Sequence, residues 1–136
     1  MKHILIIILF SVLLSQDCSE GYSYIPIEDI PFTATSLPFE LGQPYTCFND
    51  GDIAFLNDLN QINDLGYDSP LYLGTQTWNT GKLKVFVGTY TPNGAGINTT
   101  EIETLPETIS NLDELMTLYL EWNHITNLPS TFTSLV

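Results

Sequence analysis

Residues 115–125 read Leu-Met-Thr-Leu-Tyr-Leu-Glu-Trp-Asn-His-Ile, and a Leu-Pro pair stands on each side of them. Leu105-Pro106 comes before this stretch and Leu128-Pro129 comes after it, so the two pairs are 23 residues apart. A fixed period of this length predicts a repeat architecture, in which each unit buries its apolar face against a neighbour. Apolar residues recur in the same step: Ile102 with Ile125, Ile109 with Phe132, and Leu112 with Leu135.

The centre of this stretch has the alternation of a short strand. Leu118 and Leu120 alternate with polar or aromatic neighbours, so a strand would send the leucines inward and the other side chains outward. Asn123 follows where the chain must turn. Its carboxamide can supply both the donor and the acceptor that buried backbone groups need. The pattern therefore predicts a strand followed by a turn that is fixed by Asn123.

The stretch fits the pattern L-x-x-L-x-L-x-x-N-x-L and resembles a leucine-rich repeat of the 23-residue type. The resemblance covers roughly residues 102–136. It implies an α/β solenoid with short parallel strands on its concave face and a helical cap at its N-terminal end. The apolar core of the repeats would then contain Leu115, Leu118, Leu120, Asn123, Ile125, Leu128, Phe132 and Leu135.

An ordinary helix is the alternative for residues 111–121, because Ser110 and Asp113 have the spacing of a capping box and the apolar residues that follow have helical spacing. The second Leu-Pro pair in the same phase favours the repeat. Upstream, residues 83–87 predict a strand in a degenerate first repeat, with a Gly- and Pro-rich loop inserted over residues 88–96.

The front of the chain predicts export. Lys2 and His3 precede an apolar run over residues 4–14, which is too short to span a membrane, and we expect a signal peptide over residues 1–15. Lipidation at Cys18 is the alternative, although the residues before it are not the small ones that such sites need. Cys18 and Cys47 could form a disulfide; otherwise Cys47 is a buried thiol.

Three further segments follow the signal peptide. Residues 16–46, with prolines at gaps of five to seven, predict an extended Pro/Tyr/Thr-rich lead-in. Residues 47–80 predict an N-terminal cap with a helix at about 50–63, started by Asn49 or Asp50. Residues 81–136 would be the leucine-rich repeats. Because the sequence stops within a predicted coil, we expect the chain to be the N-terminal part of a longer repeat protein.

The charge is strongly acidic, with sixteen acids, three basic residues and a net charge of −13. This disfavours nucleic acid and anionic lipid as partners. We expect no enzyme activity, cofactor or metal site: catalytic motifs are missing, and residues 49–52 (Asn-Asp-Gly-Asp) do not fit a calcium loop. His124 has the setting of an exposed polar residue, and Asn98-Thr99-Thr100 has the pattern of a glycosylation acceptor.

These observations predict a secreted or cell-surface module that recognises a protein or a peptide. The alternatives are a structural or adhesive surface module, or the sensor end of a longer receptor. If the resemblance holds, the ligand would contact outward side chains of the concave face. These are Thr117, Tyr119, Glu121, Trp122, Lys84 and Phe86. For Trp122, packing against a neighbouring coil is the alternative to ligand binding.

Overall fold

The computed structural model describes residues 17–91 and 98–135, so the expected signal peptide and most of the Gly/Pro/Asn part of the 88–96 loop lie outside the described residues. The described part contains one α-helix, six strands and four short 3-10 helices. Their order along the chain is β1 (Tyr22–Tyr24), η1 (Ile27–Asp29), β2 (Ala34–Leu37), β3 (Cys47–Asn49), α1 (Asp50–Ile62), η2 (Pro70–Tyr72), β4 (Thr75–Asn79), β5 (Lys82–Val87), η3 (Glu107–Asn111), β6 (Thr117–Tyr119) and η4 (Ser130–Leu135).

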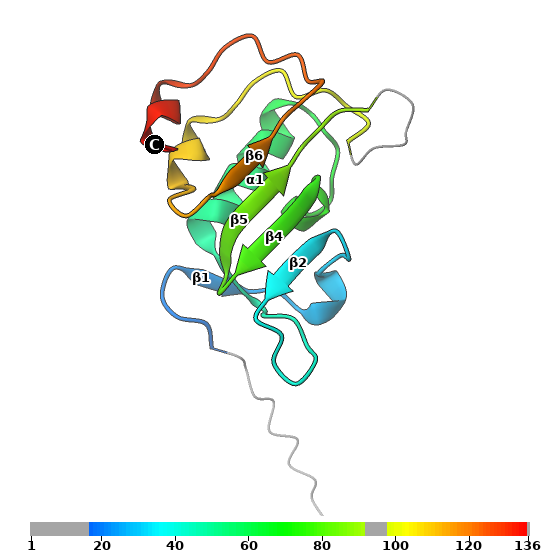
Figure 1. Cartoon of the computed structure of the whole chain (residues 1–136), viewed down its shortest axis with the longest axis vertical. Coiled ribbons are helices and arrows are strands. Elements are labelled where there is room, and N and C mark those ends of the chain that lie inside the picture. Colours follow the sequence, from blue (N-terminus) through cyan, green and yellow to red (C-terminus); the bar gives the residue numbers. More distant parts are fainter. Residues whose placement is uncertain (1–16, 92–97, 136) are drawn as a thin grey trace, which may run out of the picture.

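A mixed four-stranded sheet has the order β2-β4-β5-β6. The central pair, β4 and β5, is antiparallel, while β2 and β6 each pair in parallel with their neighbour. Figure 1 shows this sheet in front of α1, with β2 and β6 at its two edges. The second sheet is the antiparallel pair β1-β3.

The β4–β5 hairpin is closed by the two residues Thr80 and Gly81, both with positive φ. Hairpins with two-residue loops favour this geometry because its twist matches that of the strands. Gly81 is required for a second reason, since a Cβ there would collide with the carbonyl oxygen of Cys47. The hairpin and β3 are therefore in close contact.

The core lies between α1 and the inner face of the four-stranded sheet. Asn49 caps α1 by accepting hydrogen bonds from the backbone N–H groups of the first turn. The helix buries Phe55, Leu56 and Leu59 completely. Phe55 packs edge-on against Phe86 of β5, with ring centroids 6.1 Å apart. The helix expected over residues 50–63 is thus present, but it covers a face of the sheet and does not cap a coil.

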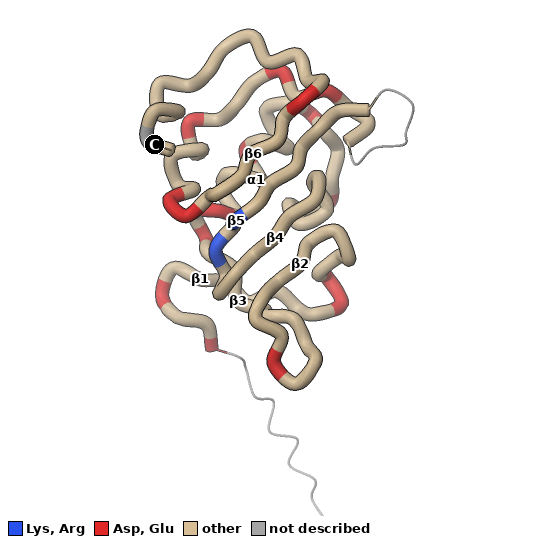
Figure 2. Tube along the Cα trace, in the orientation of Figure 1, with Lys and Arg blue, Asp and Glu red and all other residues tan. Residues whose placement is uncertain are grey.

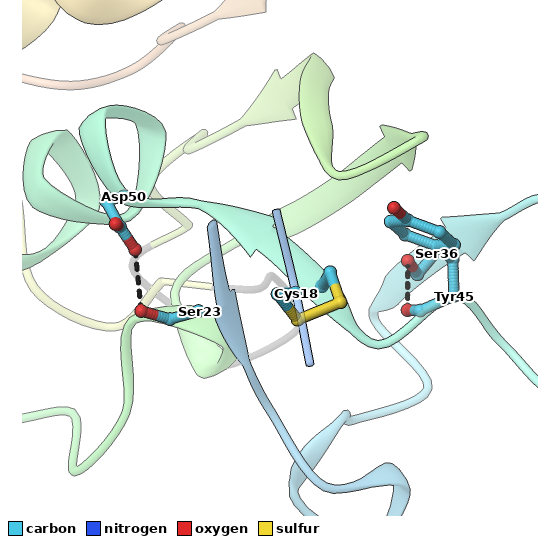
Figure 3. Close-up of a disulfide and its surroundings, with 6 residues drawn as sticks. Cys18, Ser23, Ser36, Tyr45 and Asp50 are labelled. Atoms are coloured by element: carbon cyan, nitrogen blue, oxygen red, sulfur yellow. Dashed lines mark hydrogen bonds between the residues drawn. A yellow bond between two sulfur atoms is a disulfide. The ribbon is translucent and has the colours of Figure 1, made fainter. Parts of the chain in front are cut away.

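Cys18 and Cys47 form a disulfide, with their Cα atoms 5.6 Å apart. It joins the start of the described chain to β3 (Figure 3). The same figure shows Ser23 of β1 donating to the carboxylate of Asp50 at 2.6 Å, so a second contact ties β1 to the start of α1. The predicted lead-in over residues 16–46 is therefore more than a linker, because its described part supplies β1 and β2.

The prediction of a leucine-rich repeat solenoid over residues 81–136 is wrong. The described chain forms a small α/β domain with one helix and two small sheets, and its central strand pair is antiparallel. The recurring Leu-Pro pairs have a local cause: Pro106 and Pro129 each directly precede a 3-10 helix, η3 and η4, and these two helices pack on each other. The period therefore reflects two similar turns and not a stack of coils.

The helical alternative for residues 111–121 is also wrong. Residues 117–119 form β6, and Leu118 pairs with Phe86 in parallel register. Leu118, Leu120 and Ile125 pack only partly against the core, while Leu128 is 59% exposed, so the predicted repeat core is not a closed interior. The remaining apolar members of that set are Leu115, Phe132 and Leu135, which are half-buried against the core, and its polar member Asn123 is half-buried as well.

Candidate functional site

The face of the four-stranded sheet opposite α1 is the candidate site. Figure 1 shows α1 behind the sheet, and no other described segment lies in front of it. The inner face is marked by Trp78 of β4 and Phe86 of β5, which are fully buried. Because side chains alternate along a strand, their neighbours point to the opposite side. We call this side the open face and define it by Thr35, Thr75, Thr77, Val85, Val87, Thr117 and Tyr119.

The strand register arranges the open face in rows. One row runs across all four strands and contains Thr35, Thr77, Val85 and Thr117 in paired positions. A second row contains Thr75, Val87 and Tyr119. These two rows carry small hydroxyl and aliphatic side chains, with one aromatic residue on β6. By the same alternation the paired residues Leu37 and Asn79 continue this side of the sheet.

Tyr119 and Trp122 are the exposed aromatic residues at the β6 end of this surface. Tyr119 is 49% exposed and Trp122 is 79% exposed. Trp122 lies three residues after the end of β6 and has a φ of 65°. The alternative that Trp122 packs on a neighbouring coil does not apply, because the described chain forms no solenoid. Thr117 is half-buried and Glu121 is exposed.

One predicted contact residue lies elsewhere. Phe86 is fully buried against Phe55 on the inner face and cannot reach a ligand on the open face. Lys84 falls where the β4–β5 register shifts, since Thr77 pairs with Val85 but the next residue pairs with Leu83. Lys84 is half-buried and ion-paired with Glu114.

A buried carboxylate underlies the start of β5. Asp52 of α1 is 1% exposed, and its Oδ2 accepts a hydrogen bond of 2.8 Å from the backbone N–H of Leu83. Burial raises the pKa of the Asp52 carboxyl to about 6, although the Leu83 N–H and the charge of Lys82 both lower it. Lys82 Nζ lies 3.8 Å from Asp52 and 2.6 Å from Asp113. Figure 2 shows the two lysines side by side at the start of β5, with acids nearby.

Asn123 makes the hydrogen bonds expected of it. Its Nδ2 donates to the carbonyls of Gly88 and Leu120 at 2.8 and 3.0 Å, and its Oδ1 accepts from the N–H of Ile102 at 2.8 Å. One side chain therefore ties the turn after β6 to the end of β5 and to the segment before η3. This positions β6, and with it Thr117 and Tyr119.

The contribution of β2 and β4 to the open face was not predicted from the sequence. In β4 the run Thr-Gln-Thr-Trp hides the usual alternation, because Gln76 is polar and yet fully buried. Its Nε2 donates to the carbonyls of Pro70 and Leu73, and its Oε1 accepts from the Trp78 ring N–H. The β-branched threonines at alternate positions, Thr75 and Thr77, are the signal that could have found this strand.

The described residues contain no cluster of His, Cys, Asp and Glu that could hold a metal ion. Asn98, the acceptor of the glycosylation pattern, is fully buried and its Oδ1 accepts from the Tyr67 hydroxyl. A glycan on Asn98 is incompatible with this packing. No family model, curated protein or solved structure matches this chain.

The compartment is constrained only coarsely. The disulfide is compatible with an extracellular protein. Among residues 17–91 and 98–135, none of the helices has the length and apolar character needed to cross a membrane.

Proposed function

We propose that this protein is a secreted or cell-surface module that recognises a protein or a peptide on its open face, without catalysing a reaction. The observation that carries the proposal is that no described segment covers this side of the four-stranded sheet, to which all four strands contribute side chains. A sheet side that no described segment covers leaves its side chains available to a partner.

The composition of the open face supports recognition by a partner. Threonine and valine have few rotamers, so ordering them on binding costs little conformational entropy. Threonine hydroxyls can donate and accept hydrogen bonds, which suits the peptide groups of a bound protein. Tyr119 and Trp122 supply exposed aromatic surface, the type of side chain that most often dominates the affinity of an interface.

The same composition is the reason for proposing no reaction. The side chains that define the open face are Thr, Val and Tyr, and they include no carboxylate or imidazole to act as a general base. The two lysines of β5, Lys82 and Lys84, are engaged by Asp113 and Glu114.

A photo-crosslinking experiment in the native surroundings tests the proposal. A benzophenone amino acid is placed at Thr77 or Thr117 on the open face, and at Gln61, an exposed residue of α1, as the control. We expect one protein or peptide to be captured from the two open-face positions and not from Gln61. Equal capture from all three positions would refute the assignment of the face.

The captured partner is then purified and its affinity measured directly. Tyr119→Ala should weaken binding by about 1–2 kcal/mol, as for an aromatic interface residue of intermediate importance. Tyr24→Ala is the matched control, because Tyr24 is 47% exposed and lies on β1, outside the four-stranded sheet. If both variants bind the purified partner like the wild type, Tyr119 has no part in recognition.

A further inference from the structure

A concave site that shares no residue with the open face is formed by the segment that connects α1 to β4. It is a pocket of about 380 Å³ lined by Gly66, Tyr67, Asp68 and Tyr72. Two tyrosines and one aspartate therefore border the same small volume. Gly66 has a φ of +77°, and apart from its two chain neighbours no residue has an atom within 4 Å of the position that its Cβ would take.

Tyr67 is held at both ends. Asn60 of α1 donates to the Tyr67 carbonyl at 2.7 Å and accepts from the Tyr67 N–H at 3.1 Å. The Tyr67 hydroxyl donates to Oδ1 of the fully buried Asn98 at 3.1 Å. Burial raises the pKa of this hydroxyl, so it stays protonated as the donor. The ring is thus fixed in place before any ligand arrives.

Tyr72 is positioned by its neighbours in the chain. Leu71 and Leu73 are fully buried, and they anchor η2 on either side of Tyr72. Ser69 caps the turn by accepting from the Leu71 N–H. Tyr72 itself remains 48% exposed at the pocket.

Within residues 17–91 and 98–135, no lysine or arginine borders this pocket. The described residues contain two lysines and no arginine, and both lysines are paired with acids that border β5. Asp68 is exposed at the pocket, in a chain with a net charge of −13. A field of this sign concentrates cations near the surface.

We propose that the pocket formed by Tyr67, Asp68 and Tyr72 binds an organic cation, an alkylammonium or guanidinium group. Tyrosine rings attract such cations through their π-electrons, and this attraction is greatest when several aromatic residues line one site. The Asp68 carboxylate supplies the opposite charge. The cation could be a free quaternary ammonium compound or the side chain of a lysine or arginine in a partner. The site does not depend on the function proposed for the open face.

The test is a titration followed by amide NMR shifts, with choline as the probe and 3,3-dimethylbutan-1-ol as its neutral analogue of the same shape. We expect choline to shift the amides of residues 66–72 and the neutral analogue to bind there several times more weakly. Equal binding of the two compounds, shifts confined to other residues, or no shift would overturn the proposal. So would binding of neutral monosaccharides to these residues in preference to choline.

Two pairs of variants locate the contacts. Tyr72→Leu should weaken choline binding about two- to fivefold, the range expected for an exposed cation–π contact, while its matched control Tyr24→Leu should not. Asp68→Asn should weaken binding as well, with Asp29→Asn of η1 as its control. If neither pocket variant changes the affinity while the far-UV circular dichroism stays native, the site is refuted.

A final comparison separates the two sources of the cation. The methylamides of Nα-acetyl-lysine and Nα-acetyl-arginine are titrated against the same amides as choline. Tighter binding of either amino acid derivative identifies a protein side chain as the natural ligand, and tighter binding of choline identifies a free quaternary ammonium. Both results support an organic cation site.

Discussion

Replacing Asp52 with asparagine should stabilise the domain at neutral pH and remove part of its pH dependence. The Asp52 carboxyl is buried beneath the start of β5, where Oδ2 accepts the Leu83 N–H and Oδ1 has no hydrogen-bond partner. Lys82 lies 3.8 Å away but is closer to Asp113. The hydrogen bond from Leu83 and the charge of Lys82 therefore offset only part of the free-energy cost of burying the ionised Asp52 carboxylate.

The magnitude follows from the pKa of Asp52, which burial raises from 3.8 to about 6. Each pKa unit corresponds to about 1.4 kcal/mol, so ionised Asp52 lowers the free energy of unfolding at pH 7 by at most about 3 kcal/mol. Solvent around the exposed Asp113 screens part of this electrostatic effect. We therefore expect Asp52→Asn to raise the free energy of unfolding at pH 7 by about 1.5–3 kcal/mol. Because the folded-state pKa is the higher one, the folded protein binds the proton more tightly between these two values. The Asp52 contribution to stability therefore rises as pH falls from above 6 to about 4.

The assay is urea unfolding at pH 4.5, 5.5, 6.5 and 7.5, followed by tryptophan fluorescence, in which the buried Trp78 becomes exposed to water on unfolding. Asp52→Asn keeps an oxygen that can accept the Leu83 N–H, and its side chain is neutral at every pH. We expect the variant to be more stable than the wild type at pH 7.5 and the difference to shrink steadily toward pH 4.5. The control Asp64→Asn removes an exposed acid just after α1 and measures the effect of lowering the net charge alone. A difference between Asp52→Asn and wild type that is constant across this range, or that grows as pH falls, would refute the reasoning.

Three other perturbations have defined outcomes. Glu107→Gln should increase amide hydrogen exchange at the start of η4, because the Glu107 carboxylate accepts hydrogen bonds from the first two backbone N–H groups of that helix. The same hydrogen bonds lower the pKa of the Glu107 carboxyl below its ordinary value of 4.5. The wild type should therefore lose this protection from exchange as the pH falls through the lowered pKa. Unchanged exchange in the Glu107→Gln variant would argue against the contact. Removing the disulfide with Cys18→Ser and Cys47→Ser should lower the free energy of unfolding, measured with urea, by about 3–4 kcal/mol. This is the value that the chain-entropy model gives for a loop of this length. A loss below about 1 kcal/mol would contradict this estimate. Asn123→Ala should cost about 2–4 kcal/mol, because it leaves several backbone groups without partners, whereas Asn127→Ala, which removes a weak exposed contact, should be nearly neutral.

The elements that could be predicted from the sequence are those with a local signal. The helix is visible because Ile53, Leu56 and Leu59 recur at helical spacing after a capping asparagine. The β5 and β6 strands and the role of Asn123 are also local features. By contrast, β1, β2 and β3 are three or four residues long, too short to show a period.

The arrangement of the elements could not be predicted from the sequence. Its periodicity indicates where turns and strands lie, but it does not specify which elements pack beside one another. The Leu-Pro pairs specify where η3 and η4 begin, and nothing in them specifies a stack of parallel strands. The antiparallel β4–β5 pair depends on the two-residue turn at Thr80 and Gly81, and that turn depends on its contact with β3. Of the residues that define the open face, the sequence pointed only to Thr117 and Tyr119, because β2 and β4 come from segments interpreted as a lead-in and a cap.

Buried polar side chains explain why the four-stranded sheet keeps a fixed shape although its open face is not covered by another segment. Gln76 holds β4 against η2, and Asn123 holds the turn after β6 against the end of β5. Asp52 holds the first residues of β5 against α1. Each of these side chains anchors backbone from the inner side, at a place where an apolar residue would leave N–H or C=O groups unpaired. The side chains on the open face are therefore not needed to hold the strands in place. They can give up hydrogen bonds to water and form hydrogen bonds to a partner.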